Sequence, residues 1–154
     1  MERCIPLRTM RINLFFILLF AVTGVTAEGS REVVLVVASE SPIVAVSSLE
    51  LRKLYLGLPV ALQGNFARPL RNHSDEQLQE IFFQSAMAMS EAAYERQLLS
   101  LTLRFGRLQP EVRHSVEDLK DILREDDKAI TYMWRSDIAE EDDLRVVKLL
   151  WLEH

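Results

Sequence analysis

The sequence predicts a single α/β domain of three layers, in which helices cover a mixed β-sheet. Three observations predict this fold class. Strand-like apolar segments alternate with amphipathic helical segments in the first half of the chain. Two further strand-like segments follow near the C-terminus. The 154 residues contain neither an internal repeat nor a second domain, and this length is enough for one domain with a substantial core.

Residues 1–27 have the pattern of a secretory signal peptide. Three arginines within the first eleven residues precede the apolar run 12–22, and small residues at 25–27 suit a signal peptidase. The run is shorter than the roughly 20 apolar residues of a permanent membrane helix. We therefore expect cleavage after Ala27, a mature domain at 28–154 and a location in the bacterial periplasm. A retained membrane anchor and a start at Met10 are the alternatives.

The mature chain is predicted to be acidic and free of cysteine. Of 18 basic and 23 acidic residues, three and one lie in residues 1–27, which leaves 15 against 22 and a net charge of −7. This charge argues against nucleic acid or an anionic membrane surface as a partner of the whole chain. Cleavage after Ala27 would remove the sole cysteine, Cys4, and with it any disulfide framework or thiol chemistry. Cys4 also precedes the apolar run, which argues against a lipid anchor.

The first elements follow from local patterns. Residues 31–38 are continuously apolar and β-branched, which is typical of a buried strand. Ser47 and Glu50 have the spacing of a capping box, so a helix is expected to start there and to end at Gly57. Residues 59–66 are predicted to be a loop. Residues 67–72 are predicted to form a short strand, in which Pro69 favours an edge or a strand start.

Three more helices and two strands complete the order β-α-β-α-α-α-β-β. A helix capped by Ser74 or Asp75 should bury Leu78, Ile81, Phe82 and Ser85 and break near Ser90. The next helix should run to Gly106 and carry Tyr94, Leu98, Leu101 and Phe105 on one face. After a loop at 107–114, Ser115 should cap a helix that buries Val116, Leu119 and Leu123. Strands are expected at 129–134 and 144–152.

Most catalytic chemistry finds no support in the sequence. The three histidines share no metal-ligand spacing, and no GxSxG elbow or phosphate-binding glycine loop occurs. The acid clusters at 124–127 and 139–143 are typical of solvated turns. We therefore expect neither an enzyme nor a cofactor nor a metal.

An anion site at helix starts is the one candidate with a mechanism. Free N–H groups in a first helical turn attract anions, and Ser47, Ser48 and Ser74 lie at two predicted helix starts. Arg71 could add a charge-assisted contact to an oxyanion. The acidic residues at 75–76 oppose this, because they compete for the same helix end. An ordinary capped helix is the alternative.

The order of the segments resembles a known family. VVLVVASESP, SSLELRKLYLG, RPLRNHS before a Phe-bearing helix, SVEDLKDILRED and AITYMW follow one another within residues 32–151. This order resembles the phosphate ABC-transporter substrate-binding family, and most closely its short, stand-alone periplasmic binding protein-like (type 2) members. The resemblance implies one lobe of that fold, with residues 54–57 as the family's helix-ending tetrad and 130–132 as its late strand. Of the family's ligand set, it carries over Arg71 and Ser74.

The chain also departs from that family. No Trp follows the tetrad, Thr131 replaces a glycine, and Ser74-Asp75-Glu76 replaces the Ser-Gly-Thr turn that grips phosphate. Full-length members enclose the solute between two lobes, whereas this chain matches one. We therefore expect a secreted, non-enzymatic solute-binding-like protein that takes phosphate or a related oxyanion in ABC-type uptake or sensing. The alternative is a degenerate lobe that serves as a protein-interaction module for a membrane transporter, a sensor or an envelope complex.

Overall fold

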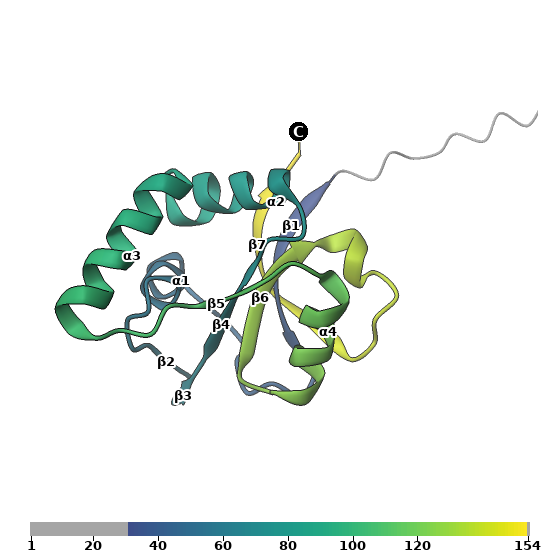
Figure 1. The fold of residues 1–154 in the computed structure, drawn as a ribbon. Helices are drawn as coiled ribbons and strands as arrows, with labels where there is room; N and C mark the ends of the chain where they lie inside the picture. The colour runs from purple at the N-terminus through teal and green to yellow at the C-terminus, as the bar shows by residue number, and fades with distance from the viewer. Residues whose placement is uncertain (1–30, 154) are drawn as a thin grey trace, which may run out of the picture.

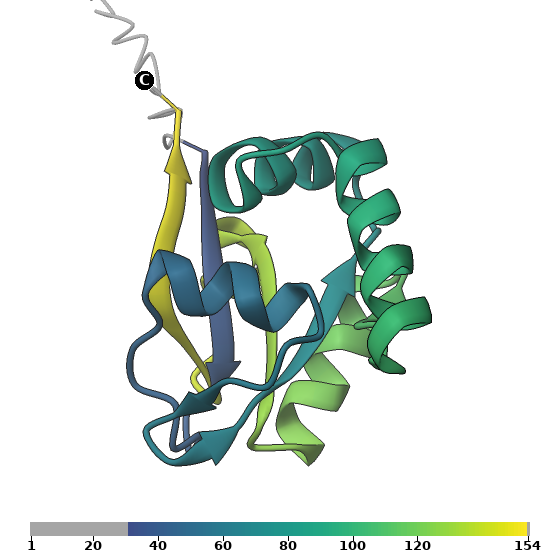
Figure 2. The same ribbon diagram turned by 90° about the vertical axis from the view of Figure 1, so that its left-hand side faces the viewer.

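A computed structural model describes residues 31–153, so the predicted signal peptide lies outside the described residues. Its main sheet has five strands in the order β5-β4-β6-β1-β7. Their bounds are β1 Glu32–Ala38, β4 Arg68–Asn72, β5 Glu111–Arg113, β6 Ala129–Trp134 and β7 Leu144–Leu152. β1 pairs antiparallel with β6 and β7, and β4 pairs parallel with β5 and β6. The predicted mixed sheet is confirmed, and Figure 2 shows β1 beside β7 with β4 toward the other side.

β1 lies inside the sheet because its side chains are apolar in both directions. Val33, Leu35 and Val37 belong to one buried cluster, and Val34 and Val36 belong to a second on the opposite face. All five are fully buried. A continuous apolar run, rather than an alternating one, is what a strand covered on both faces requires.

Helices cover both faces of the sheet. The larger cluster receives side chains from α1 (Ser48–Tyr55), α2 (Glu76–Ile81), the π-helix η1 (Phe82–Met87) and α3 (Glu91–Phe105). The smaller cluster receives side chains from α4 (Val116–Glu125) and the 3₁₀ helix η2 (Arg135–Ile138). Figure 1 shows α1 and α3 on one side of the strands and α4 on the other. The three predicted layers are therefore present.

Aromatic rings dominate the larger cluster. Phe82 stacks on Tyr132 with ring centres 3.7 Å apart, and Tyr55 lies 4.8 Å from Phe82. The buried hydroxyls find acceptors: Tyr55 donates to the Leu70 carbonyl at 3.2 Å, and Tyr94 donates to the Tyr55 carbonyl at 2.5 Å. Buried tyrosines are stable only with such partners, and these bonds tie α1, α3 and β4 together.

The predicted capping box of α1 is confirmed. The Glu50 N–H donates to Ser47 Oγ at 3.2 Å, and the Ser47 N–H donates to the Glu50 carboxylate at 2.8 Å. α1 buries Leu51, Leu54 and Tyr55. Past its end, Gly57 has a φ of +70°, a conformation that glycine adopts readily.

The segment from α2 to α3 differs from the predicted helix face. Asp75, not Ser74, caps α2, and η1 adds a wider π turn after Ile81. The wider turn shifts the buried face, so that Phe82, Phe83, Ala86 and Met87 are buried whereas the predicted Ser85 is exposed. Ser90 caps α3 and Gly106 ends it, as predicted. On α3, Tyr94 and Leu98 are buried, but Phe105 is exposed because the last turn lies beyond the core.

Two predicted loops contain strands. Residues 59–66 hold a hairpin of β2 (Ala61–Leu62) and β3 (Asn65–Phe66), whose turn places Gln63 and Gly64 at positive φ. Residues 107–114 contain β5, which pairs with β4. β4 is thus an interior strand, and Pro69 sits at its start, before the pairing with β5 begins at Leu70. That position does not require a proline N–H.

α4 forms where predicted, from Val116 to Glu125 with Ser115 as its cap, and buries Leu119 and Leu123. Val116 is only partly buried, and Lys120 takes the third buried position of that helix.

Candidate functional site

Arg71 lies at the carboxyl end of β4, between β5 and β6. All three strands run parallel, and their carboxyl ends meet at one edge, where open α/β sheets commonly bind ligands. The Arg71 side chain is only 4% exposed. Arg71 is therefore in the right place for a ligand contact, but it is covered by its own chain.

Carboxylates and rings from α3 and η1 surround the guanidinium. Arg71 Nη2 donates to Glu95 Oε1 at 2.5 Å and lies 3.9 Å from Glu91 Oε1. Its Cζ atom is 5.0 Å from the centre of the Tyr94 ring and 6.0 Å from that of Phe83. The two glutamates balance its charge, and Tyr94 adds a cation–π contact.

His73 completes this arginine cluster, which consists of Arg71, His73, Glu91, Glu95 and Tyr94. Arg71 Nη2 lies 3.0 Å from His73 Nε2, which must accept because the guanidinium only donates. Burial lowers the pKa of His73, and the positive charge of Arg71 lowers it further. His114 packs edge-on against His73, with ring centres 5.7 Å apart. A neutral His73 is thus part of the resting cluster.

Ser74 turns back toward β4 instead of facing an open helix end. Its Oγ donates to Asn72 Oδ1 at 2.6 Å, and its N–H donates to the same oxygen at 3.0 Å. The Asp75 carboxylate accepts from the Leu78 N–H at 2.8 Å and so occupies the first turn of α2. Ser74 is close to Arg71 in the chain, but its two donors are already used, and the Asp75 carboxylate places a negative charge at the helix start.

Ser47 and Ser48 lie at a different helix. Ser47 is held in the capping box of α1, where the hydrogen bonds from Ser47 lower the pKa of Glu50. Tyr55, at the opposite end of α1, is the residue that reaches β4. Within residues 31–153, no hydrogen bond or ion pair joins Ser47 or Ser48 to the arginine cluster. The structure brings Arg71 and Ser74 into one turn and leaves the other two serines apart.

Sequence reasoning missed the partners of Arg71. Glu91 and Glu95 are four residues apart, which places both on one face of α3, and this spacing is a signal that could have paired them with a buried cation. No local signal places His114 beside His73, because only the parallel pairing of β4 with β5 brings them together.

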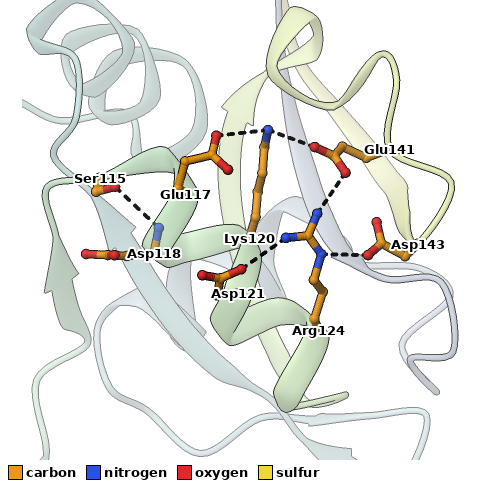
Figure 3. Close-up of polar contacts among 8 residues, drawn as sticks. All are labelled: Ser115, Glu117, Asp118, Lys120, Asp121, Arg124, Glu141 and Asp143. Carbon is orange, nitrogen blue, oxygen red and sulfur yellow. Dashed lines mark hydrogen bonds and ion pairs between the residues drawn. The ribbon is translucent and has the colours of Figure 1, made fainter.

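Two residues of the acid cluster at 139–143, Glu141 and Asp143, form ion pairs with α4, whereas Asp126 of the other cluster pairs with Arg68. Figure 3 shows Lys120 between Glu117 and Glu141, and Arg124 among Asp121, Glu141 and Asp143. Burial alone would lower the pKa of Lys120, but its hydrogen bonds to Glu141 and Glu117 raise it. The hydrogen bond from Lys120 lowers the pKa of Glu141, and that from Arg124 lowers the pKa of Asp143. These carboxylates hold α4 to the start of β7.

Two features are absent from the part of the chain that the structure describes. Across residues 31–153, no three His, Cys, Asp or Glu side chains are grouped so that they could hold a metal ion. In the same range, none of the helices combines the length and the apolar character that crossing a membrane requires.

Comparison with known proteins gives matches in structure alone. Neither protein-family models nor curated proteins match the sequence. An ABC-type phosphate transport receptor from Vibrio cholerae superposes with a TM-score of 0.55 at 10% identity, over 77% of this chain and 46% of its own. A phosphate-bound structure from Clostridium perfringens, described as a candidate phosphate ABC transporter substrate-binding protein, gives 0.59 at 14% identity, over 77% and 45%.

A possible phosphate binding protein from Planctomyces limnophilus superposes with a TM-score of 0.55 at 13% identity, over 77% of this chain and 41% of its own. This chain thus spans less than half the length of each of the three structures. At these identities the likeness shows the fold alone. Residues 31–153 form an α/β domain, with a five-stranded mixed sheet and four α-helices, that matches about half of a type 2 periplasmic binding protein chain.

Proposed function

We propose that this chain is a non-enzymatic, one-lobe binding domain of the bacterial periplasm that recognises a protein, such as a membrane transporter, a sensor or an envelope complex. The structures that share its fold are described as transport receptors and binding proteins, which supports binding rather than catalysis. The periplasmic location rests on the predicted signal peptide at 1–27.

The observation that carries the proposal is the closure of the arginine cluster. Arg71 is buried, and Glu95 and Glu91 already supply its negative charge. A phosphate ion would have to displace the Glu95 carboxylate or bind beside two glutamates that repel it. Ser74 has already given both of its donors to Asn72, and the Asp75 carboxylate at the start of α2 would repel an anion there. The same residues that suggest an oxyanion site therefore stabilise the fold.

The extent of the match, less than half of each similar structure, supports the same proposal. A small oxyanion held on one lobe remains open to water, where charge–charge contacts are screened and weak. A partner protein, in contrast, can cover an exposed surface and exclude water from it. The fold thus suits recognition of a macromolecule better than enclosure of a solute.

Oxyanion binding is the second candidate, and one observation favours it. Arg71 Nε is buried and has no hydrogen-bond partner among the described residues, so Arg71 retains a donor. In this candidate Arg71 and Ser74 contact phosphate or a related oxyanion, with Ser47 and Ser48 at the second helix start. The likeness to structures described as phosphate-binding adds support.

One experiment with two arms separates the candidates. Protein purified from expression of the full-length chain is titrated with phosphate and then sulfate in a calorimeter, at low and moderate salt. In parallel, the protein is cross-linked in the envelope of its host, and cross-linked proteins are identified by mass spectrometry. We expect no saturable heat at millimolar anion and a specific cross-linked envelope protein.

Two variants make the titration decisive. Arg71→Ala tests the cluster, and Arg96→Ala serves as a control because Arg96 is an exposed arginine on α3. Saturable heat that Arg71→Ala abolishes and Arg96→Ala leaves unchanged would overturn the protein-recognition proposal in favour of oxyanion binding. Circular dichroism of both variants checks that folding is intact.

A further inference from the structure

A groove of about 660 Å³ lies at the end of the domain where α1, α3, the β2–β3 hairpin and β5 come together. Leu54, Leu58, Val60 and Ala67 contribute apolar walls, and the segment 105–111 crosses it. In Figure 1 the hairpin and the end of α3 both lie at the lower left of the molecule. None of the arginine-cluster residues lines this groove, so it is a separate feature.

Large apolar side chains at this groove face solvent. Leu108 is 88% exposed, Phe66 68% and Phe105 64%, and all three line the groove. Single exposed apolar residues are ordinary, but a group of them around one concavity marks a surface that another molecule covers.

The backbone at Leu108 comes close to the end of α1. A Cβ atom at Gly57 would lie 2.6 Å from the Leu108 carbonyl oxygen, so the segment 106–110 packs directly on the glycine that follows α1. The Leu108 side chain is thus exposed although its backbone packs against the end of α1.

The charges beside the groove oppose those of the rest of the domain. Residues 96–110 contain Arg96, Arg104 and Arg107 and no acidic residue, although acidic residues outnumber basic ones in the whole chain, 23 to 18. Within residues 31–153 none of these three arginines forms an ion pair. Arg107 lines the groove, and its Nε is buried without a hydrogen-bond partner among the described residues. The acidic residue at the rim, Glu111, is already paired with Arg68 at 2.6 Å.

The groove also borders a strand edge that pairs with no further strand among residues 31–153. β5 is the edge strand of the sheet, and β4 is its strand partner. Gln109, Pro110 and Glu111 connect the groove to β5. An extended polypeptide can add to such an edge through its main chain while its side chains enter neighbouring pockets.

We infer that this surface, from Phe66 and segment 105–111 to the edge of β5, docks an extended acidic polypeptide segment that carries large apolar side chains. This inference rests on the proposed protein-recognition function and names the chemistry of the partner. Its apolar side chains fill the groove beside Leu108, and its carboxylates meet Arg104 and Arg107. A concave groove beside a strand edge suits a polypeptide better than the flat surface of an anionic membrane.

The test uses short random peptides displayed on phage and selected against protein purified from expression of the full-length chain. We expect enriched peptides that combine Asp or Glu with Leu, Ile, Phe or Trp. Leu108→Asp and Arg107→Glu should each weaken the binding of a synthetic version of an enriched peptide at least tenfold. Higher salt should weaken it further, because unpaired surface arginines attract the carboxylates. Leu49→Asp is the matched control, since Leu49 is 63% exposed on α1 and does not line the groove.

Other results would overturn the inference. If the enriched peptides bind the Leu108→Asp variant with the same affinity as wild type, the recognition surface lies elsewhere. Failure to enrich any peptide, with binding to phosphatidylglycerol-containing vesicles that Leu108→Asp abolishes, assigns the surface to a membrane. Cross-linking in the envelope separates this inference from the proposed function. A partner that wild type and Leu108→Asp capture equally would overturn the role of the groove but support protein recognition. The absence of any cross-linked partner would overturn both.

Discussion

At the scale of single residues, Arg71 shows how one side chain can be placed for binding and still serve the fold. Burying a guanidinium costs free energy unless an opposite charge balances it and its N–H groups find acceptors. Here Glu91, Glu95 and the face of Tyr94 supply that match from α3, and His73 adds to it from the turn after β4. The cluster therefore fixes α3 against the carboxyl end of β4, and a ligand would have to compete with these internal partners.

The stability of variants at Gly57 can be predicted from its surroundings. Gly57→Ala should destabilise the domain by about 2–3 kcal/mol, because it forces a positive φ on alanine and drives its Cβ into the Leu108 carbonyl. Gly64→Ala is the control, since Gly64 also has positive φ but has open space around it, and it should lose only about 1 kcal/mol. Urea unfolding measures both. Equal losses would show that the close approach of segment 106–110 to Gly57 contributes nothing.

At the scale of elements, the sequence predicted what local rules decide. The capping box at Ser47 and Glu50, the breaks at Ser90 and Gly106, and the strand 129–134 all have short-range signals, and all are confirmed. The three residues of β5 carry no periodicity, and their strand conformation depends on pairing with distant β4. The hairpin turn has Gln63 before Gly64, where Asn or Asp is usual. The sequence therefore lacks the Asn-Gly or Asp-Gly pair that predicts a hairpin.

The candidate site, too, could be predicted from the sequence only in part. The location of Arg71 at a strand end follows from the sequence, because the strand 67–72 has a recognisable pattern. The covering of Arg71 by residues of α3 does not follow from the sequence, because it depends on how η1 directs α3 toward β4. The π turn at Phe82–Met87 leaves no sequence signature that separates it from an ordinary helix. Whether a sequence-predicted binding residue is open or covered is thus a tertiary property.

The ion pairs between α4 and the start of β7 carry an element-scale prediction. The pKa values of Glu141 and Asp143 are lowered in the folded state by hydrogen bonds from Lys120 and Arg124. A lowered folded pKa stabilises the fold above the unfolded pKa, and this contribution is lost as pH falls through the folded value. Unfolding free energy should therefore decline below about pH 4. Glu141→Gln should be less stable than wild type at pH 7 and approach it at acid pH.

Asp142→Asn is the control for this pH dependence, because Asp142 is exposed and forms no ion pair within residues 31–153. Its denaturation curves should follow those of wild type from neutral to acid pH. A deficit of Glu141→Gln that persists unchanged at acid pH would show that the amide disturbs packing and that charge plays no part.

At the scale of the whole molecule, β1 is one of the strands that join the two cores. β1 presents Val33, Leu35 and Val37 to the larger core and Val34 and Val36 to the smaller one. Neither core can lose its packing without loosening the strand that supports the other. A domain that has the fold of one lobe thus contains a complete core on each face of its sheet, and needs no second lobe to cover either.

This arrangement predicts a single cooperative unfolding transition. Leu98→Ala in the larger core and Leu123→Ala in the smaller core remove fully buried side chains, and each should cost about 2–5 kcal/mol. Tryptophan fluorescence reports on Trp134 and Trp151, which pack together on the side of the larger core, while far-ultraviolet circular dichroism reports on all helices. Because β1 couples the cores, Leu123→Ala should shift both signals to the same lower urea midpoint. Separate midpoints, with fluorescence unchanged by Leu123→Ala, would mean that the face covered by α4 unfolds independently.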